Sequence, residues 1–393
     1  MKNAFKTMTA IAISLLFAAS VKAASPFDGS GAFGAPGLIE VPAISEAAPV
    51  AEPFMPEAEV PAKGYTPEQL RDMRQHNAAI GASANKGLGL DDERVERRYR
   101  PYADYEKTGY LIMSSDFNFN SRQAKLLLAS KLPADATLVI FTDTYGTSKE
   151  DVLREFGSVV PRERIKVVTL PGARNGFWAR DGIPVPAIDA SNNLVVVDAR
   201  YGHRFEPDAE IARLFGARLE KHQYYFEGGN FMASHAGDCI MVDHGAHRQI
   251  PDSIFVGQYG CQQMIRLPFI DGIGHIDEHV RFISERVVVT DLPQYKDTLE
   301  GKGFTVHMMP KPSGPFETYV NSVIMDGKVI VPVFGRDTDE QAFAVYRSLG
   351  LEPFGADSTT LSNSGQGSVH CITMTYPAVP ARELMKALGA TEL

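Results

Sequence analysis

Five short polar signatures, which carry cysteine, histidine, carboxylate or asparagine side chains, recur at a regular spacing in this sequence of 393 residues. A β-type run follows every signature, and in four cases a turn and a second, strongly apolar β-type run come next. Successive signatures are roughly 45 to 50 residues apart, an interval typical of repeated supersecondary units. The five signatures are Trp178–Asp181, Glu227–Asn230, Gly274–Asp277, Tyr319–Asn321 and Gly367–Cys371.

Repeated units that pack around a common axis place equivalent positions side by side, because each unit buries its apolar face only against its neighbours. Carboxylates and glycines before hairpins also serve simply to set turns. A common spacing in all five signatures favours a shared site. We therefore expect one site that collects side chains from all five units: Asp181, Glu227, His275, Asp277, Asn321 and Cys371.

Such a site is suited to covalent catalysis on a cation. Cys371 would supply a thiolate nucleophile, and His275 would act as general acid and base. Neighbouring carboxylates raise the pKa of a thiol and repel an oxyanion, so they do not help with an acyl substrate. They bind a planar guanidinium well, through charge-assisted and often bidentate hydrogen bonds. The bound cation would in turn lower the thiol pKa.

Each candidate also has a purely structural interpretation. A cysteine in a β-type run is often a small buried apolar residue, and an isolated histidine such as His275 often packs in a core. Asp181 follows Arg180 and could serve only in a structural ion pair. The run from Cys239 to His247 suggests a metal site, but its spacing matches no common zinc pattern.

The elements that must position these residues alternate, from Thr108 onward, between short β-rich runs and helical stretches, which predicts an α/β domain. Upstream, Thr66, Pro67 and Gln69 form the start signal of another helix, with Thr66 as N-cap. We predict a helical N-terminal extension over 64–100 and the α/β domain over 101–393. Within the domain, helices are expected at 122–132, 149–156, 207–219, 339–349 and 382–388.

Residues 1–23 have the form of a secretory signal peptide, with Lys2 and Lys6 before an apolar stretch and a small-x-small end. This apolar run is far shorter than the roughly 20 residues that span a bilayer, and no other run is long enough. We therefore expect an exported protein, periplasmic or secreted, that does not span the membrane. Residues 24–63 are rich in Pro, Ala and Glu without a sustained period, which indicates a disordered linker.

The composition limits the classes of molecule that the protein is expected to bind. The formal net charge is −9 and no long Lys/Arg run is present, which argues against a nucleic-acid partner and suits a cationic small molecule or peptide. Three cysteines exclude a disulfide-dense scaffold. In an exported chain Cys239 and Cys261 could pair and leave Cys371 free, but two reduced cysteines fit the sequence as well. The oligomeric state cannot be inferred.

The five signatures, in this order and approximate spacing, resemble the motifs of the agmatine deiminase and bacterial-type peptidylarginine deiminase family, part of the guanidine-modifying superfamily. The resemblance covers about residues 100–390 and implies a five-bladed α/β propeller, the pentein fold, built from ββαβ-like units. It implies that Cys371 is the nucleophile, that His275 is the general acid and base, and that Asp181 and Asp277 clamp the guanidinium. Neither a metal ion nor an organic cofactor is implied.

By the same resemblance Trp178 and Asn321 shape the substrate channel, and Glu227 matches the acid of the agmatine-type enzymes. The implied reaction is hydrolytic deimination through a covalent thiouronium-like intermediate. Peptidyl-arginine or free arginine would give citrulline and ammonia, whereas agmatine would give N-carbamoylputrescine and ammonia. The predicted export favours an arginine substrate, whose carboxylate Arg200 or Arg204 would bind, although a solvated loop charge explains these residues equally well.

Other classes of function remain open. An amidinotransferase would use the same thiol and histidine, and a non-catalytic binder of arginine-rich peptides would keep the carboxylates. A papain-like cysteine protease is least favoured, because its cysteine precedes its histidine and no carboxylate pair surrounds the thiol.

Overall fold

The computed structural model describes residues 60–87, 95–144 and 146–379. The predicted signal peptide, nearly all of the predicted linker and the helix expected at 382–388 lie outside these residues. Of the helices described, none is both long and apolar enough to cross a membrane.

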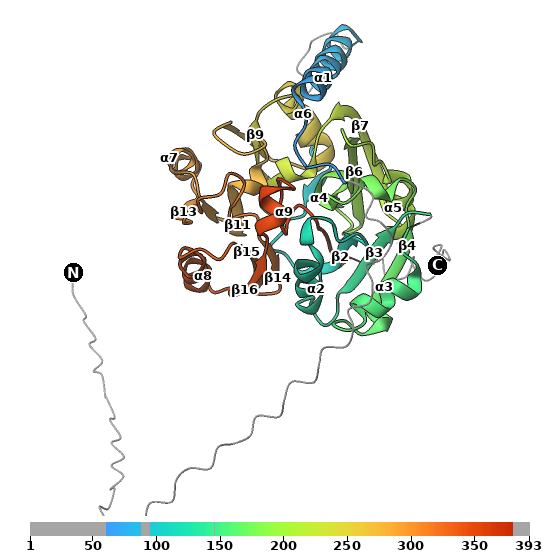
Figure 1. Ribbon diagram of the computed structural model, residues 1–393. Coiled ribbons are helices and arrows are strands. Elements are labelled where there is room, and N and C mark those ends of the chain that lie inside the picture. Colours follow the sequence, from blue (N-terminus) through green and yellow to red (C-terminus); the bar gives the residue numbers. More distant parts are fainter. Residues whose placement is uncertain (1–59, 88–94, 145, 380–393) are drawn as a thin grey trace, which may run out of the picture. The chain divides into compact units, whose positions relative to one another are not determined.

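Within this part of the chain the strands form five separate sheets with helices between them, a mixed α/β arrangement as predicted (Figure 1). The two four-stranded sheets have the orders β1 (Tyr99–Pro101), β5 (Val185–Asp189), β6 (Leu194–Arg200), β7 (Arg218–Tyr225) and β17 (Met374–Pro377), β2 (Thr108–Ser114), β3 (Thr137–Thr142), β4 (Ile165–Thr169). The three-stranded sheets have the orders β10 (Gln263–Pro268), β9 (Asp238–Asp243), β8 (Met232–Ala233); β11 (Val280–Ser284), β12 (Val287–Thr290), β13 (Thr305–Met308); and β14 (Val323–Met325), β15 (Lys328–Val333), β16 (Glu352–Asp357).

Every sheet contains the same unit, an antiparallel pair whose second strand pairs in parallel with a third. In the first sheet β5 and β6 are antiparallel and β6 and β7 are parallel. The fifth unit combines both ends of the domain, because β17 pairs antiparallel with β2, where Met374 lies opposite Ile112, and β2 is parallel to β3. The repeat inferred from the sequence corresponds to this unit.

Helices cover the sheets and connect their strands. They are α2 (Arg122–Ser130), α3 (Lys149–Phe156), α4 (Ala179–Gly182), α5 (Asp208–Phe215), α6 (Asp252–Ile254), α7 (Pro293–Gly301), α8 (Asp339–Ser348) and α9 (Thr359–Asn363). The prediction at 149–156 coincides with α3, and those at 122–132 and 339–349 run slightly too long. The helix predicted at 207–219 is wrong at its end. Gly216 adopts a φ of 59°, which ends α5, and the chain continues as β7.

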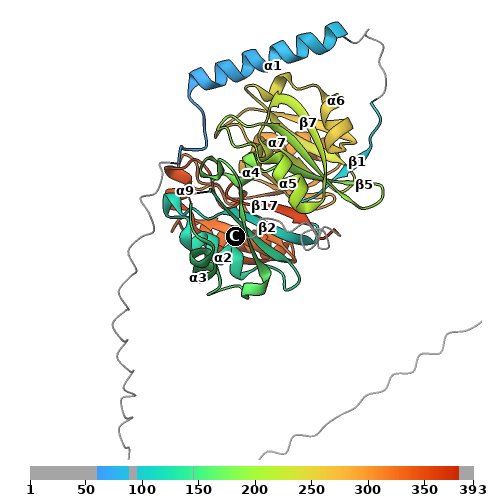
Figure 2. The same cartoon turned by 90° about the vertical axis from the view of Figure 1, so that its right-hand side faces the viewer.

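Helix α1 (Pro67–Gly87) begins at the predicted start signal. The Gln69 N–H donates to Thr66 Oγ1 (3.2 Å), and the Thr66 N–H donates to Gln69 Oε1 (2.9 Å), a reciprocal capping box. The helix lies against β7 (Figure 2), where the buried Asn77 amide donates to the carbonyls of Tyr225 (3.1 Å) and Ala246 (2.9 Å). These two bonds hold α1 in place, and α1 in turn anchors the C-terminal end of the segment that precedes it.

Candidate active site

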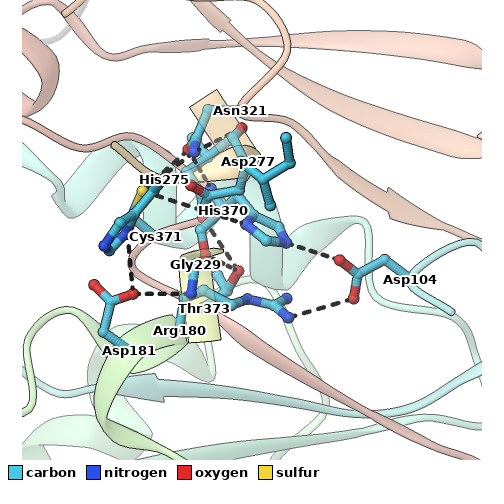
Figure 3. A network of polar contacts seen from close by, with 12 residues as sticks. Asp104, Arg180, Asp181, Gly229, His275, Asp277, Asn321, His370, Cys371 and Thr373 are labelled. Atoms are coloured by element: carbon cyan, nitrogen blue, oxygen red, sulfur yellow. Dashed lines mark hydrogen bonds and ion pairs between the residues drawn. The ribbon is translucent and has the colours of Figure 1, made fainter. Parts of the chain in front are cut away.

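Each signature lies just before the first strand of an antiparallel pair, so the repeat brings all five together (Figure 3). The six predicted residues are all buried. Asp181 lies in α4 before β5, Glu227 precedes the turn η4 (Gly228–Asn230) and β8, His275 and Asp277 flank the start of η7 (Ile276–Glu278) before β11, Asn321 precedes β14, and Cys371 precedes β17.

The thiol of Cys371 is surrounded by polar groups. Asn321 Nδ2 donates to its Sγ at 3.2 Å, and Asp277 Oδ2 lies 3.6 Å from the sulfur. Burial and then the charge of Asp277 raise the pKa of Cys371 to about 12. Cys371 is therefore protonated at neutral pH, and a positive charge beside it would favour the reactive thiolate.

His275 has a carboxylate near each ring nitrogen. Asp181 Oδ1 is 3.6 Å from Nδ1, and Glu227 Oε2 is 3.8 Å from Nε2. Burial opposes the charged ring, but Asp181 and Glu227 raise the pKa of His275 above its ordinary value. Glu227 itself accepts hydrogen bonds from His247 Nε2 and from the Tyr65 hydroxyl (2.9 Å). Glu227 therefore acts on the charge and orientation of the His275 ring.

Asp181 and Asp277 each have one oxygen fixed and one available for a cation. Asp181 Oδ1 accepts the Gly229 N–H (3.0 Å), and Asp277 Oδ2 is bonded to His370 Nδ1 (2.7 Å). A Cβ at position 229 would lie 2.8 Å from both Asp181 Oδ1 and His275 Nδ1, so glycine is needed there. Asp181 Oδ2 and Asp277 Oδ1 are buried, without a hydrogen bond from any described residue. Burying charged oxygens of this kind costs folding free energy unless a cation approaches them.

A second layer holds Asp277 in place through His370. The other ring nitrogen of His370, Nε2, is 2.9 Å from Asp104 Oδ2. Asp104 also pairs with Arg281 Nη1 (2.9 Å) and with Arg180 Nη1 (3.4 Å), as Figure 3 shows for Arg180. Arg180 thus pairs with this carboxylate, and Asp181 stays directed at the site. His370 and Asp104 are positioning residues.

The cation beside these carboxylates is Lys63 of the same chain. Its Nζ lies 2.9 Å from His275 Nδ1 and 3.1 Å from Cys371 Sγ. It also approaches Asp181 Oδ2 (3.4 Å) and Asp277 Oδ1 (3.9 Å). Its side chain is 1% exposed. One ammonium therefore bridges the thiol and the imidazole and occupies the space between the two aspartates.

Sequence reasoning missed Lys63, Asp104 and His370 as parts of the site. Lys63 is the last residue of the predicted linker, where no motif surrounds it. Asp104 carries no local signal either. His370 stands next to Cys371 inside a signature, and this adjacency was the one available indication.

The remaining predicted residues lie farther from the chemistry. The Trp178 ring is buried and stacks on Phe119, and its Nε1 donates to the Pro61 carbonyl (3.1 Å). The Arg200 guanidinium lies over the Tyr225 ring, 5.2 Å from its centroid. Arg204 is exposed. In the described ranges neither arginine contacts the thiol, the imidazole or the two aspartates.

The structure also bears on the pairing of the cysteines and on the suggested metal site. Cys239 and Cys261 form a disulfide, and Cys371 keeps a free, buried thiol. Among the described residues no group of three or more His, Cys, Asp or Glu side chains is placed to hold a metal ion.

Comparisons with known proteins point in one direction. A family model described as Porphyromonas-type peptidyl-arginine deiminase matches residues 121–377. A Selenomonas ruminantium protein that carries a provisional agmatine deiminase name is 22% identical over an alignment of 319 positions, which covers 61% of this chain and 83% of that protein. Two solved structures of agmatine deiminases have a similar fold. The C. jejuni enzyme has a TM-score of 0.59 and 18% identity, over 70% of this chain and 95% of that chain. The Enterococcus faecalis enzyme has a TM-score of 0.58 and 16% identity, over 71% of this chain and 96% of that chain.

Proposed function

Because the chain belongs to the Porphyromonas-type peptidyl-arginine deiminase family, hydrolases that deiminate guanidinium groups, we propose that it converts peptidyl-arginine or free arginine to the citrulline form with release of ammonia. One observation carries the proposal. A cation is bound between Asp181 and Asp277 with its nitrogen 3.1 Å from Cys371 Sγ and 2.9 Å from His275 Nδ1. A guanidinium in this position would be placed for attack by the thiol.

The first half of the reaction forms a covalent intermediate. The substrate cation offsets the carboxylate charge that raises the pKa of Cys371, so the thiol transfers its proton to His275. The thiolate then bonds to the guanidinium carbon. His275 returns the proton to one amino nitrogen, the C–N bond breaks, and ammonia leaves. A thiouronium-like adduct on Cys371 remains between the two aspartates.

The second half consumes water. His275 accepts a proton as the water oxygen bonds to the same carbon. The C–S bond then breaks with its electron pair on sulfur, which restores the Cys371 thiolate and releases a ureido product. One water is consumed and one ammonia is released in each turnover.

We also propose that the five sheets are the blades of a five-bladed propeller. Three features support this arrangement: the common unit in every sheet, the pairing of β17 with β2, which joins the two ends of the domain, and the meeting of all five signatures at one site. A crystal structure with the blades in any other arrangement would contradict it.

Export is a further proposal, in which residues 1–23 are removed and the enzyme acts in the periplasm or outside the cell. The disulfide between Cys239 and Cys261 supports it, because such bonds persist in oxidising compartments. N-terminal sequencing of the protein from fractionated cells is expected to begin at residue 24. An uncleaved cytoplasmic chain would contradict export.

Agmatine is the second candidate substrate and would give N-carbamoylputrescine. The presence of Glu227, which matches the acid of the agmatine-type enzymes, favours it. In the structure, however, Glu227 contacts His247 and approaches His275, so it serves the general base with either substrate.

A single assay tests both substrates. The purified chain is incubated with agmatine, arginine and arginine peptides, and ammonia and ureido product are measured together. Equal amounts of both are expected, and Cys371→Ala should abolish both. Ammonia release without an added amine contradicts an amidinotransferase, whereas the absence of both products in every variant would contradict the deiminase.

A further inference from the structure

The main chain of Lys63 is bound as well as its side chain. Residues 60–65, called here the Lys63 segment, run across the site before α1. The Lys63 N–H donates to the Gly365 carbonyl (2.8 Å), and the Lys63 carbonyl lies 3.1 Å from His203 Nε2. The backbone is therefore held on both sides of the Cα whose side chain enters the site.

Flanking residues of the segment make similar contacts. Before Lys63, the Pro61 carbonyl accepts the Trp178 Nε1–H (3.1 Å). After it, the Gly64 N–H donates to Gln366 Oε1 (3.1 Å). These bonds use main-chain groups, which every polypeptide carries. The same partners would therefore receive another polypeptide that continues in both directions from a long cationic residue.

An arginine in the pose of Lys63 would place its guanidinium carbon where the lysine nitrogen lies. Counted from Cβ, Nζ is the fifth side-chain atom of lysine, and Cζ is the fifth of arginine. An arginine with this backbone would thus place Cζ near the position of Nζ, 3.1 Å from Cys371 Sγ. Reacting atoms about 3 to 3.5 Å apart are at near-attack distance. The two terminal amino groups would then extend beyond Cζ toward the carboxylates.

We propose that the site binds arginine residues internal to a polypeptide, and that the Lys63 segment occupies this site as an intramolecular pseudosubstrate. The inference rests on the proposed deiminase function and deepens it. The lysine ammonium has no carbon between nitrogens for the thiolate to attack, so Lys63 fills the site without being consumed. A substrate must displace the segment, which competes at the high effective concentration of a tethered ligand.

Contacts after Lys63 add a sequence preference. A Cβ at Gly64 would lie 2.5 Å from Gln366 Oε1 and 3.2 Å from Ile273 Cγ2, so the site fits glycine after the arginine. The next residue, Tyr65, stacks on His203 with ring centroids 4.6 Å apart. An Arg-Gly-aromatic sequence inside a peptide is the substrate that these contacts favour.

Binding is tested without turnover in a Cys371→Ala background. The probe is a fluorescent peptide with blocked ends and an internal Arg-Gly-Tyr sequence. Adding Lys63→Met, which keeps the apolar stem and removes the charge, is expected to lower the dissociation constant roughly tenfold or more, because the free fraction of the site rises. Lys302→Met, at an exposed lysine after α7, is the matched control and should change nothing. Equal affinity with and without Lys63→Met, or no binding to either variant, overturns the proposal.

A second variant turns the segment into a substrate. In Lys63→Arg, position 63 is expected to become citrulline at a rate independent of protein concentration, as seen by peptide mass spectrometry. Adding Cys371→Ala should prevent it. An enzyme that hydrolyses free guanidines but leaves position 63 as arginine overturns the pseudosubstrate. If no variant hydrolyses any guanidine, the deiminase function fails, and the binding experiment still decides whether the segment blocks a peptide site.

Discussion

Asp277 and His370 are joined by a hydrogen bond of 2.7 Å between Oδ2 and Nδ1, which leaves Asp277 Oδ1 to face the cation. His370 is anchored on its other side by Asp104. The carboxylate thus enters the site with its orientation already fixed, and little of the binding energy of a guanidinium is spent on arranging it.

We predict that Asp277→Asn lowers kcat/KM for any guanidine by about 100-fold or more. One of the two charges that hold the cation is lost, while the amide keeps the volume of the side chain. Ammonia release under steady-state conditions measures the effect. Asp297→Asn, at an exposed position of α7, is the matched control. A loss no greater than that of the control would exclude Asp277 from the guanidinium site.

The pH profile should report on the pair formed by Glu227 and His275. His275 must be unprotonated to accept the thiol proton in the first half of the reaction, so activity is lost as pH falls through its pKa. Burial and the Lys63 charge oppose protonation of the ring, but Asp181 and Glu227 raise the pKa of His275, which places the acidic limb above about 6.5. Glu227→Gln removes one raising charge and is expected to move the limb to lower pH.

The measurement is kcat against pH for both enzymes. Glu285→Gln, whose carboxylate pairs with Tyr105 elsewhere, should leave the limb unchanged. A purely structural role for Glu227 would reduce activity equally at every pH, and that result would contradict the assignment.

The disulfide should contribute to stability and leave the chemistry unchanged. Cys239 and Cys261 are 22 residues apart, and a loop of this length constrains the unfolded chain by about 3 kcal/mol. The double variant Cys239→Ala/Cys261→Ala is expected to lose about that much unfolding free energy in urea titrations, with activity retained in native buffer. If reduction of the wild type by dithiothreitol leaves its urea midpoint unchanged, the bond is absent in solution.

The repeat explains why much of this site could be predicted. Equivalent positions in repeated units must converge, so one interval along the chain was enough to group Asp181 with Cys371. Lys63 has no such periodicity. The two nearest partners of its Nζ, His275 and Cys371, are 212 and 308 residues away, and the position of Lys63 depends on how the segment that contains it docks. Asp104 likewise acquires its role only from the folded chain.

Sequence patterns were also reliable only where the interacting residues are close together in the chain. The capping signal at Thr66 predicted the start of α1, because both partners of the capping box are three residues apart. The hypothesis for Arg200 and Arg204 relied on position along the chain alone. In the structure Arg204 is exposed and Arg200 stacks on Tyr225, while a main-chain carbonyl is bound nearby by His203.

Gln366 offers the sharpest test of substrate choice. Its φ of 63° is unfavourable for a side chain, so Gln366→Gly relieves strain while it removes the acceptor for the N–H after the substrate residue. Agmatine has no such N–H. In this variant both a peptide substrate and the Lys63 segment lose the hydrogen bond to residue 366. Agmatine loses no bond, and its kcat/KM rises because the segment competes less strongly for the site. The ratio of kcat/KM for a blocked Arg-Gly peptide to that for agmatine is expected to fall about threefold to tenfold, the effect of one hydrogen bond.

Arg204→Ala is the matched control for this ratio, because its exposed side chain should leave both substrates unaffected. If Arg204→Ala selectively weakens free arginine, a carboxylate site at Arg204 is the better explanation. If Gln366→Gly leaves the ratio unchanged, the amide of residue 366 does not bind the peptide backbone, and the contact seen with Gly64 serves only to hold the segment. These outcomes separate recognition of an internal arginine from recognition of a free one.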